Sequence, residues 1–380
     1  MSTREVVITG LGLVSGAGEG VAAHRAALEA GRPPRTDAET FAPWPVHPVA
    51  PLSLDGQIPK KADQRQMEPW QRLGVYAAGL ALDAAGLKGD AARKGAMHLI
   101  VAAGGGERDY AVDGQILTGL RAADDPGAFL NERLQNDLRP TLFLAQLSNL
   151  LAGNIAIVHG VTGASRTFMG EESSGVDALR IAQARIAAGQ VECMLVGGSY
   201  NAERADVLLV HEMGGFLQRP DYAPVFRREG NGGFILGSGA AFLVLESAAH
   251  AAARGAAPLA RLAAVASDRT RRAPGSVTAS LAGLWRQAGL EAPDAVISGA
   301  TGCAGITGEE AASLATLAPG ARVSALGDLT GHTLEVTAPF GAALAALLVA
   351  EGAAREVAVT AVGHRRGEGV IRILPAGSSA

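Results

Sequence analysis

The residues of this chain best suited to chemistry are two adjacent carboxylates, Glu171 and Glu172, which are followed by Ser173 and Ser174. Residues 173–189 carry apolar side chains at helical spacing, which predicts a helix with the two serines as caps and the acids at its amino end. The positive end of the helix dipole favours an ionised carboxylate there. Such a group accepts hydrogen bonds and can act as a general base, but it is a poor nucleophile.

A second candidate is His332, which could transfer protons at neutral pH or act as a hydrogen-bonded structural histidine. Equally, acids in the first turn of a helix often serve helix stability alone. Cys193 and Cys303 are the only cysteines, and we expect both to be small buried apolar residues. Neither has a ligand-spaced partner, so no metal is predicted. The glycines between residues 10 and 18 do not form G-x-G-x-x-G, so no dinucleotide cofactor is predicted either.

Alternating strands and helices must position these residues. Apolar periodicity predicts strands over residues 4–15, 98–103, 164–169, 191–197, 233–246, 259–267, 295–298, 323–326, 357–362 and 370–374. It predicts helices over residues 18–31, 70–85, 141–152, 173–189, 277–288, 309–317 and 339–354. Residues 36–67 are Pro-rich and aperiodic, which predicts a long surface excursion. This order indicates an α/β fold of two similar halves, 1–248 and 249–380.

Bulk composition excludes several classes of protein. A net charge of −4 and a pI of about 6.1 argue against a nucleic-acid binder. The longest apolar stretch, residues 341–350, is about half the roughly 20 residues that a membrane span needs. The start of the chain lacks the apolar core of a signal peptide. Two cysteines give no disulfide framework and suggest a reducing compartment, so we expect a soluble, cytoplasmic protein.

Four segments, in order along the chain, carry a family resemblance. Residues 163–175 read Gly-Ala-Ser-Arg-Thr-Phe-Met-Gly-Glu-Glu-Ser-Ser-Gly. This run resembles G-P-S-x-T-x-x-T-A-C-S-S-G, the nucleophile segment of the β-ketoacyl-acyl-carrier-protein synthases. Residues 6–15, 224–246 and 329–332 resemble three further segments of the same family. The resemblance implies a thiolase-like fold with a five-layered α-β-α-β-α core, and a dimer formed through strands near the nucleophile segment.

The departures from the family pattern concern the residues that do its chemistry. Only His332 matches a family catalytic residue. The altered positions are Glu172 for the Cys, Thr301 for the first His, Gly327 for the Lys, and the bulky, charged loop 363–369 with His364, Arg365 and Arg366 in place of the oxyanion and gating loop. A carboxylate cannot be acylated by a thioester and pass the acyl group on as a thiolate does. No residue is therefore assigned a catalytic role with assurance, and the site is interpreted as degenerate.

These observations favour a pseudoenzyme similar to a chain length factor. The resemblance implies a heterodimer with a Cys-bearing β-ketoacyl-ACP synthase subunit, whose acyl pocket this chain would shape in type II polyketide, aryl-polyene-like or fatty-acid-like chain elongation. We favour the aryl-polyene-like kind. An acyl carrier protein would be reached through the partner. No cofactor is expected.

Two alternatives remain open. Glu172 and His332 could decarboxylate malonyl-ACP or serve another non-condensing acyl-ACP reaction. The chain could instead be a homodimeric module that binds acyl groups. Five arginines could meet an acidic carrier protein or simply form a solvated face; they are Arg269, Arg271, Arg272, Arg365 and Arg366.

Overall fold

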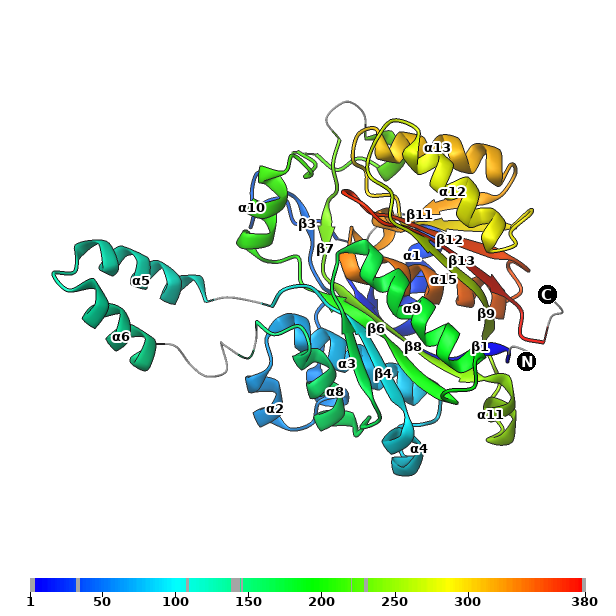
Figure 1. The fold of residues 1–380 in the computed structure, drawn as a ribbon, viewed down its shortest axis with the longest axis horizontal. Coiled ribbons are helices and arrows are strands. Elements are labelled where there is room, and N and C mark those ends of the chain that lie inside the picture. Colours follow the sequence, from blue (N-terminus) through cyan, green and yellow to red (C-terminus); the bar gives the residue numbers. More distant parts are fainter. Residues whose placement is uncertain are drawn as a thin grey trace.

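The computed structural model describes residues 4–31, 35–106, 109–137, 144, 146–219, 221–228 and 232–377. Within them, eleven strands form one mixed sheet in the order β11-β10-β12-β13-β9-β1-β8-β6-β4-β5, with β2 beside β1 (Figure 1). A second small sheet pairs β3 with β7. The strands are β1 (Val6–Ser15), β2 (Gly18–Glu19), β3 (Val46–His47), β4 (His98–Ala102), β5 (Ser165–Phe168), β6 (Cys193–Tyr200), β7 (Leu236–Gly237), β8 (Gly239–Ser247), β9 (Ala260–Asp268), β10 (Ala295–Ser298), β11 (Arg322–Ala325), β12 (Val357–Val362) and β13 (Glu368–Leu374).

The helices cover both faces of this sheet. They are α1 (Gly20–Ala30), α2 (Lys61–Gln66), α3 (Pro69–Ala84), α4 (Ala91–Ala96), α5 (Tyr110–Ala122), α6 (Pro126–Asn136), α8 (Leu150–His159), α9 (Glu172–Ala187), α10 (Ala205–Met213), α11 (Ala248–Ala253), α12 (Ser276–Gln287), α13 (Ile306–Leu317), α14 (Gly327–Thr330) and α15 (Thr337–Ala350). Three short 3-10 turns accompany them, at η1 (Leu54–Gly56), η2 (Val225–Arg227) and η3 (Leu334–Val336).

The two ends of the sheet repeat one pattern. In the first part, β1, β8 and β6 are antiparallel neighbours, and β6, β4 and β5 run parallel. In the second part, β9, β13 and β12 are antiparallel, and β12, β10 and β11 run parallel. Only two residue pairs, Val7 with Arg261 and Ile8 with Ala260, join the parts through β1 and β9. The sheet is thus two similar units that share a narrow seam.

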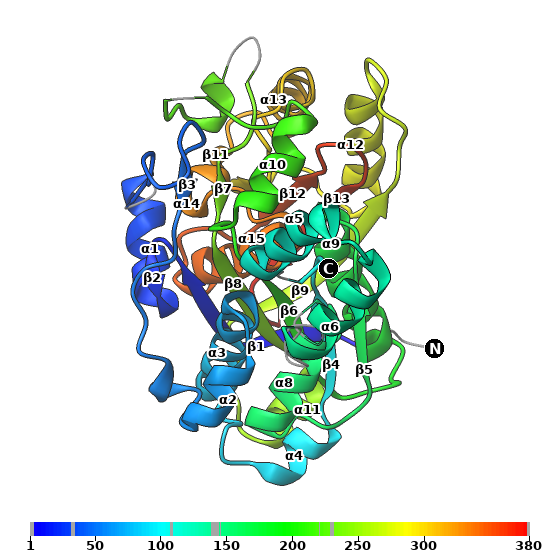
Figure 2. The same cartoon turned by 90° about the vertical axis from the view of Figure 1, so that its left-hand side faces the viewer.

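The layers follow from which helices each unit buries. Helices α9 and α15 lie between the two parts of the sheet (Figure 1). Helices α3 and α8 cover the outer face of the first part, while α12 and α13 cover the second, at the opposite end of the molecule (Figure 2). Nearly every residue of α15 is buried, as expected for a helix enclosed on both sides. The five-layered α-β-α-β-α fold predicted from the sequence is confirmed.

Helix α9 presents its predicted apolar face to the core, since Val176, Leu179, Ala182 and Ile186 are all buried. The predicted serine caps are wrong. Glu171 occupies the N-cap without a side-chain cap bond, and both serine hydroxyls lie inside the first turn, where they donate to the carbonyl oxygens of Gly170 and Glu171. The first turn is therefore bonded back to the preceding loop.

Two other regions differ from the prediction. Residues 36–67 are not only a surface excursion, because Val46 and His47 pair with β7, and Ile58 and Met67 are buried. Buried apolar side chains attach this segment to the rest of the protein, although its sequence has no regular apolar spacing. The helix predicted at 141–152 falls partly outside the described residues, and the described helix is α8, Leu150–His159.

Helices α5 and α6 form an arm that projects from the body (Figure 1). They pack on each other, and neither buries a single residue. At the root of the arm, the backbone N–H of Gly106 donates to the carbonyl of Gln146 at 3.3 Å. In the part of the chain that the structure describes, no helix combines the length and apolar character needed to cross a bilayer.

Candidate functional site

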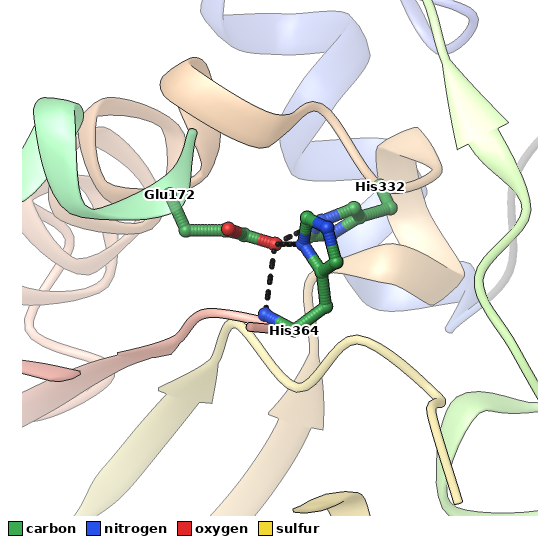
Figure 3. A group of neighbouring side chains, drawn as sticks. All are labelled: Glu172, His332 and His364. Atoms are coloured by element: carbon green, nitrogen blue, oxygen red, sulfur yellow. Dashed lines mark hydrogen bonds and ion pairs between the residues drawn. The ribbon is translucent and has the colours of Figure 1, made fainter. Parts of the chain in front are cut away.

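Three segments distant in sequence meet at the amino end of α9 (Figure 3). Glu172 is the first residue of α9, His332 follows α14, and His364 lies in the loop between β12 and β13. His332 is held by its backbone, which donates to Ile235 at 2.8 Å. The His364 loop is closed by a 2.8 Å bond from Gly363 N–H to the carbonyl of Gly367. Each side chain is thus fixed by the backbone that carries it.

The helix and the neighbouring turn approach one another closely. A Cβ on Gly175, in the first turn of α9, would lie 2.3 Å from the carbonyl oxygen of Glu335 in η3. Glycine therefore permits the contact that brings α9 against the segment after His332. A larger residue would separate Glu172 from His332.

Backbone strain marks the same place. Glu171, directly before α9, has φ 56° and ψ −139°, and Leu334, two residues after His332, has φ 45°. These are the only non-glycine residues of positive φ among those described. Such conformations cost roughly 1–3 kcal/mol each and persist where surrounding structure imposes them. The fold therefore keeps a strained turn on both sides of the cluster.

One carboxylate oxygen receives all the donors. The Nε2 atom of His332 and the Nδ1 atom of His364 each lie 2.8 Å from Oε1 of Glu172. The backbone N–H of His364 also donates to Oε1, at 3.3 Å. Glu172 is 1% exposed, and both histidines are equally enclosed, at 3% and 2%. Because an ionised carboxylate only accepts hydrogen bonds, both imidazoles present N–H groups to it.

Burial and hydrogen bonding oppose each other in this cluster. Burial favours the neutral form of Glu172, but the bonds from His332 and His364 outweigh it and hold the pKa of this carboxyl well below its usual range. Burial also lowers the pKa of His364, yet its hydrogen bond to Glu172 leaves that pKa above the ordinary value. The pair is therefore a buried carboxylate beside an imidazole whose protonated form it stabilises.

Aromatic rings surround the cluster. Phe216 stands edge-on to His364 with ring centroids 4.7 Å apart, and Phe234 lies 4.8 Å from His332. His211 contacts His364 at 5.5 Å, and burial, together with the charge of His364, lowers the pKa of His211 to about 3. These rings therefore exclude water from the cluster, which strengthens the hydrogen bonds to Glu172.

A third carboxyl group lies nearby. Glu335, in η3, is buried, and a Cβ on Gly104 would lie 2.6 Å from its Oε1 atom. Burial raises the pKa of Glu335 to about 7, and the charges of Glu172 and Glu171 add to the effect. This carboxyl therefore keeps its proton to a higher pH than Glu172 does.

The sequence singled out some of these residues and missed others. Glu172 and His332 lie together. His364, noted only as part of an altered loop, brings a second imidazole to the cluster. Arg365 lies at the rim, 4.0 Å from Glu171 and over the ring of Phe216.

The remaining altered positions stay outside the cluster. Arg366 is exposed, and Thr301 is buried with its hydroxyl accepting from the backbone of Cys303. Glu335 and His211 were not predicted. The signal available for Glu335 was a lone acid directly before the apolar run that forms α15.

The cysteines are buried, as predicted. Burial raises the pKa of Cys193 well above its usual value and that of Cys303 to about 11. Among the described residues, neither thiol forms a hydrogen bond with Glu172, His332 or His364. Neither is therefore an activated nucleophile in this arrangement.

Glu172, His332 and His364 are of types that bind transition metals, and their donor atoms lie within 4.8 Å of one another. Both nitrogens, however, face a single oxygen at hydrogen-bonding distance. A bound metal would have to displace both N–H protons. The arrangement is that of a carboxylate that accepts hydrogen bonds from two imidazoles.

Comparisons with known proteins identify the family and the fold of this chain. A family profile described as "Beta-ketoacyl synthase, N-terminal domain" matches residues 3–251. The 3-oxoacyl-acyl-carrier-protein synthase 2 of Vibrio harveyi is 30% identical over an alignment of 270 positions that covers 67% of this chain and 61% of that protein. The protein of that name from Vibrio cholerae is 29% identical over 269 residues, with the same shares of both chains. The chain thus spans 61% of the length of these curated relatives.

Solved structures match over the full chain. The ishigamide ketosynthase/chain length factor superposes with a TM-score of 0.82 at 23% identity, covering 99% of this chain and 100% of that one. A β-ketoacyl synthase from Burkholderia phymatum STM815 gives a TM-score of 0.82 at 20% identity, covering 98% and 100%. At these identities the likeness concerns the fold.

Proposed function

The chain belongs to the β-ketoacyl synthase family, and we propose that within it the chain is a non-condensing subunit similar to a chain length factor. It would pair with a Cys-bearing synthase subunit and shape the pocket in which that partner's acyl chain lies. The halves 1–248 and 249–380 would act as one scaffold. Aryl-polyene-like elongation is the process we favour.

The observation that carries this proposal is the bonding of Glu172. The resemblance assigns the family's thiol position to Glu172, and three N–H groups converge on the Oε1 atom of this carboxylate. One of them is the backbone N–H of His364, from the loop that the family uses for its oxyanion hole. Donors that would stabilise a developing oxyanion are thus already occupied by a permanent anion. Acyl transfer would have neither a nucleophile nor free donors.

Pairing is supported by surfaces that the single chain leaves uncovered. The α5–α6 arm buries none of its residues, and helices of 13 and 11 residues are marginal in water without packing. Strand β5 ends the sheet with one edge free among the described residues. Met169 and Ile157, at 62% and 72% exposed, are apolar residues after β5 and on α8, which packs beside it. A second subunit would cover these surfaces. A structural neighbour known as a ketosynthase/chain length factor joins the two kinds of subunit in its name.

Co-purification tests the proposal. The tagged chain is produced with a Cys-bearing synthase from the same genome, and the complex is sized by light scattering. We expect a one-to-one complex that condenses acyl-ACP with malonyl-ACP, with release of CO₂, whereas the tagged chain alone does not. A matched variant, Ile157→Lys, should weaken the complex, while Leu209→Lys on exposed α10 should not. Condensation by the purified chain alone would refute the proposal.

A second candidate is decarboxylation of malonyl-ACP, because the structure does bring Glu172 and His332 together with another imidazole. Its weakness is that the depressed pKa makes Glu172 a feeble base. Incubation with malonyl-ACP followed by mass spectrometry separates the two functions. Conversion to acetyl-ACP by the wild type, lost in Glu172→Ala, would favour this candidate.

A further inference from the structure

The loop 363–367, which carries His364, lies directly on the first turn of α9. A Cβ on Gly363 would lie 3.1 Å from Oε2 of Glu172, and one on Gly367 would lie 2.7 Å from a side chain in that turn. The two glycines permit this approach, but glycine also leaves both ends of the loop with the most conformational freedom to lose. Holding His364 within hydrogen-bond reach of Glu172 therefore calls for a contact from outside the loop.

Arg272, between β9 and α12, supplies such a contact at both ends of the loop. One terminal nitrogen of its guanidinium group donates to the carbonyl oxygen of Gly363, at the start of the loop. The other donates to the carboxylate of Glu368, the first residue after the loop. Val362 and Glu368 form the last pair of the β12–β13 ladder, so both contacts lie where the loop leaves the strands. A single side chain, 91 and 96 residues away from these partners in the sequence, thus spans the base of the loop.

The acceptor of this bridge is itself well fixed. Glu368 is 1% exposed, and Thr270 donates to it twice, from the hydroxyl to Oε1 at 2.7 Å and from the backbone N–H to Oε2 at 3.1 Å. The guanidinium group of Arg272 also donates to the Thr270 hydroxyl, at 3.1 Å, and the Arg272 side chain is 19% exposed. Hydrogen bonds between ionised groups are shorter and stronger than neutral ones. The bridge is therefore a largely buried, charge-assisted contact.

Arg269, in the same segment, makes a weaker kind of contact. It donates to Asp177 of α9 at 2.9 Å, and its side chain is 66% exposed. An exposed ion pair of this kind contributes little to stability. The solvated face or carrier-protein contact considered for Arg269 and Arg272 is thus replaced by contacts within the chain, and the buried one is made by Arg272.

We propose that Arg272 is a positioning residue, which holds His364 against Glu172. It does so by bonding to Gly363 and Glu368, so that the imidazole and the backbone N–H carried by the loop stay on the carboxylate. Arg272 acts through the loop, and the cluster remains closed because the loop is held at its base. The inference goes beyond the proposed function, because it concerns the chain by itself and holds whether or not the chain pairs with a synthase.

The first test follows the protonation of His364 by NMR on protein labelled with ¹⁵N in its histidine rings. Arg272→Met keeps the apolar stem and removes the donors, and Arg271→Met, at an exposed neighbour, is the matched control. The hydrogen bond to Glu172 raises the pKa of His364 in the wild type. In Arg272→Met we expect this pKa to fall towards its ordinary value of about 6.5, and in Arg271→Met to stay raised. His364→Gln identifies the signal by its loss.

The neighbours of His364 make this readout specific. Neither substitution alters the charged and titratable groups that face His364 or share its acceptor, which are Glu171, Glu172, His211, His332 and Arg365. A change in the pKa of His364 therefore reports where its imidazole lies. A general loss of stability in Arg272→Met would leave this pKa unaltered in the folded protein.

Proteolysis gives a second readout. Trypsin cleaves after arginine, and the loop carries two exposed ones, Arg365 and Arg366, but a bound loop resists cleavage until it opens. We expect cleavage after either residue to be at least about tenfold faster in Arg272→Met than in the wild type. Arg272→Lys keeps a charge for Glu368 but lacks the planar fork that also reaches Gly363, so both of its readouts should lie between those of the wild type and Arg272→Met.

A wild-type pKa for His364 or a wild-type cleavage rate in Arg272→Met would overturn the inference, even if the melting temperature falls, because Arg272 would then be a merely structural residue. Equal changes in Arg271→Met would overturn it as well. If Arg272→Met does not fold, Arg272→Lys decides, and unchanged readouts there contradict the proposal. None of these outcomes involves the synthase partner, so pairing of the wild type, measured separately, tests the proposed function alone.

Discussion

The imidazole of His364 reaches across 192 residues of sequence to lie 2.8 Å from the carboxylate of Glu172. Both groups are buried, and the carboxylate meets His332 at the same oxygen. The amino end of α9 therefore carries a buried carboxylate that accepts hydrogen bonds from His332 and His364. Removing either partner would leave the other buried without its hydrogen bond, so the fold depends on the pair being kept together.

Removing the carboxylate should destabilise the fold. Glu172→Ala leaves the buried N–H groups of His332 and His364 without their acceptor, and breaking a buried pair of this kind typically costs about 3–5 kcal/mol. Glu172→Gln keeps the shape and should cost less. Urea unfolding measures both, with Glu29→Ala on exposed α1 as the control near zero. A loss below roughly 1 kcal/mol in Glu172→Ala would mean that the pair contributes little.

The contribution of His364 should depend on pH. Its folded pKa is raised, so its stabilising effect is complete below about pH 6.5, the unfolded value, and is lost as pH rises through the folded pKa. The free-energy difference between wild type and His364→Gln should therefore shrink from pH 6 to pH 9. Glu172 has the opposite sign, and its contribution falls only in strong acid. A difference that grows with pH would contradict the assignment.

Glu335 should destabilise the fold increasingly as pH rises from about 4.5 to about 7. Its pKa is raised from 4.5 to about 7, so stability falls as pH rises through that window, by about 3 kcal/mol at 1.36 kcal/mol per unit. The groups that face it include Glu171, Glu172 and His364. Glu335→Gln should be more stable than wild type at pH 8 and close to it at pH 5. The denaturant midpoints of the variant and the wild type are measured at both pH values. If the substitution changed stability equally at pH 5 and pH 8, that would argue against a buried titrating carboxyl.

The strained turn before α9 can be relieved. Glu171 has a positive φ that glycine adopts freely, so Glu171→Gly should stabilise the protein by about 1 kcal/mol after the entropic cost of glycine. Ser173→Gly, within the first turn of α9, should instead destabilise by about 1 kcal/mol. Thermal unfolding compares the two. Destabilisation by both would indicate that contacts of Glu171 outweigh its backbone strain.

Restoring a thiol should not restore condensation. Glu172→Cys would place a thiol near His332 and His364. The sequence resemblance, however, assigns the position of the family's first histidine to Thr301, whose hydroxyl cannot replace an imidazole in proton transfer near neutral pH. Incubation with acyl-ACP and malonyl-ACP, followed by mass analysis, should detect no elongated product. The active partner subunit serves as the positive control. Product from the variant alone would reveal catalytic competence in this scaffold.

Helices and strands were predicted well from the sequence where the local spacing of apolar residues determines them. Strands β10 and β12 have the predicted bounds, because each is a short apolar run between turn residues. The buried face of α9 follows from helical spacing. The α5–α6 arm was missed, since it buries nothing and so carries no strong apolar stripe.

The cluster was only half predictable. Glu172 and His332 stand in recognisable motifs, whereas His364 joins them through a loop whose place is set by the packing of β12 and β13. Glu335 resembles an ordinary surface acid in the sequence. Its burial follows from the close approach of Gly104 and Gly175, which are distant from it in the chain. Contacts of this kind arise from tertiary packing and have no local signature.

The root of the arm has one further consequence. Gly106 lines a pocket of about 250 Å³ and bonds to Gln146, where the chain leaves for and returns from α5 and α6. A partner that fixes the arm would therefore hold one residue of the pocket lining in place. If binding in the pocket shifts Gly106, thermodynamic linkage requires each binding event to change the affinity of the other by the same factor.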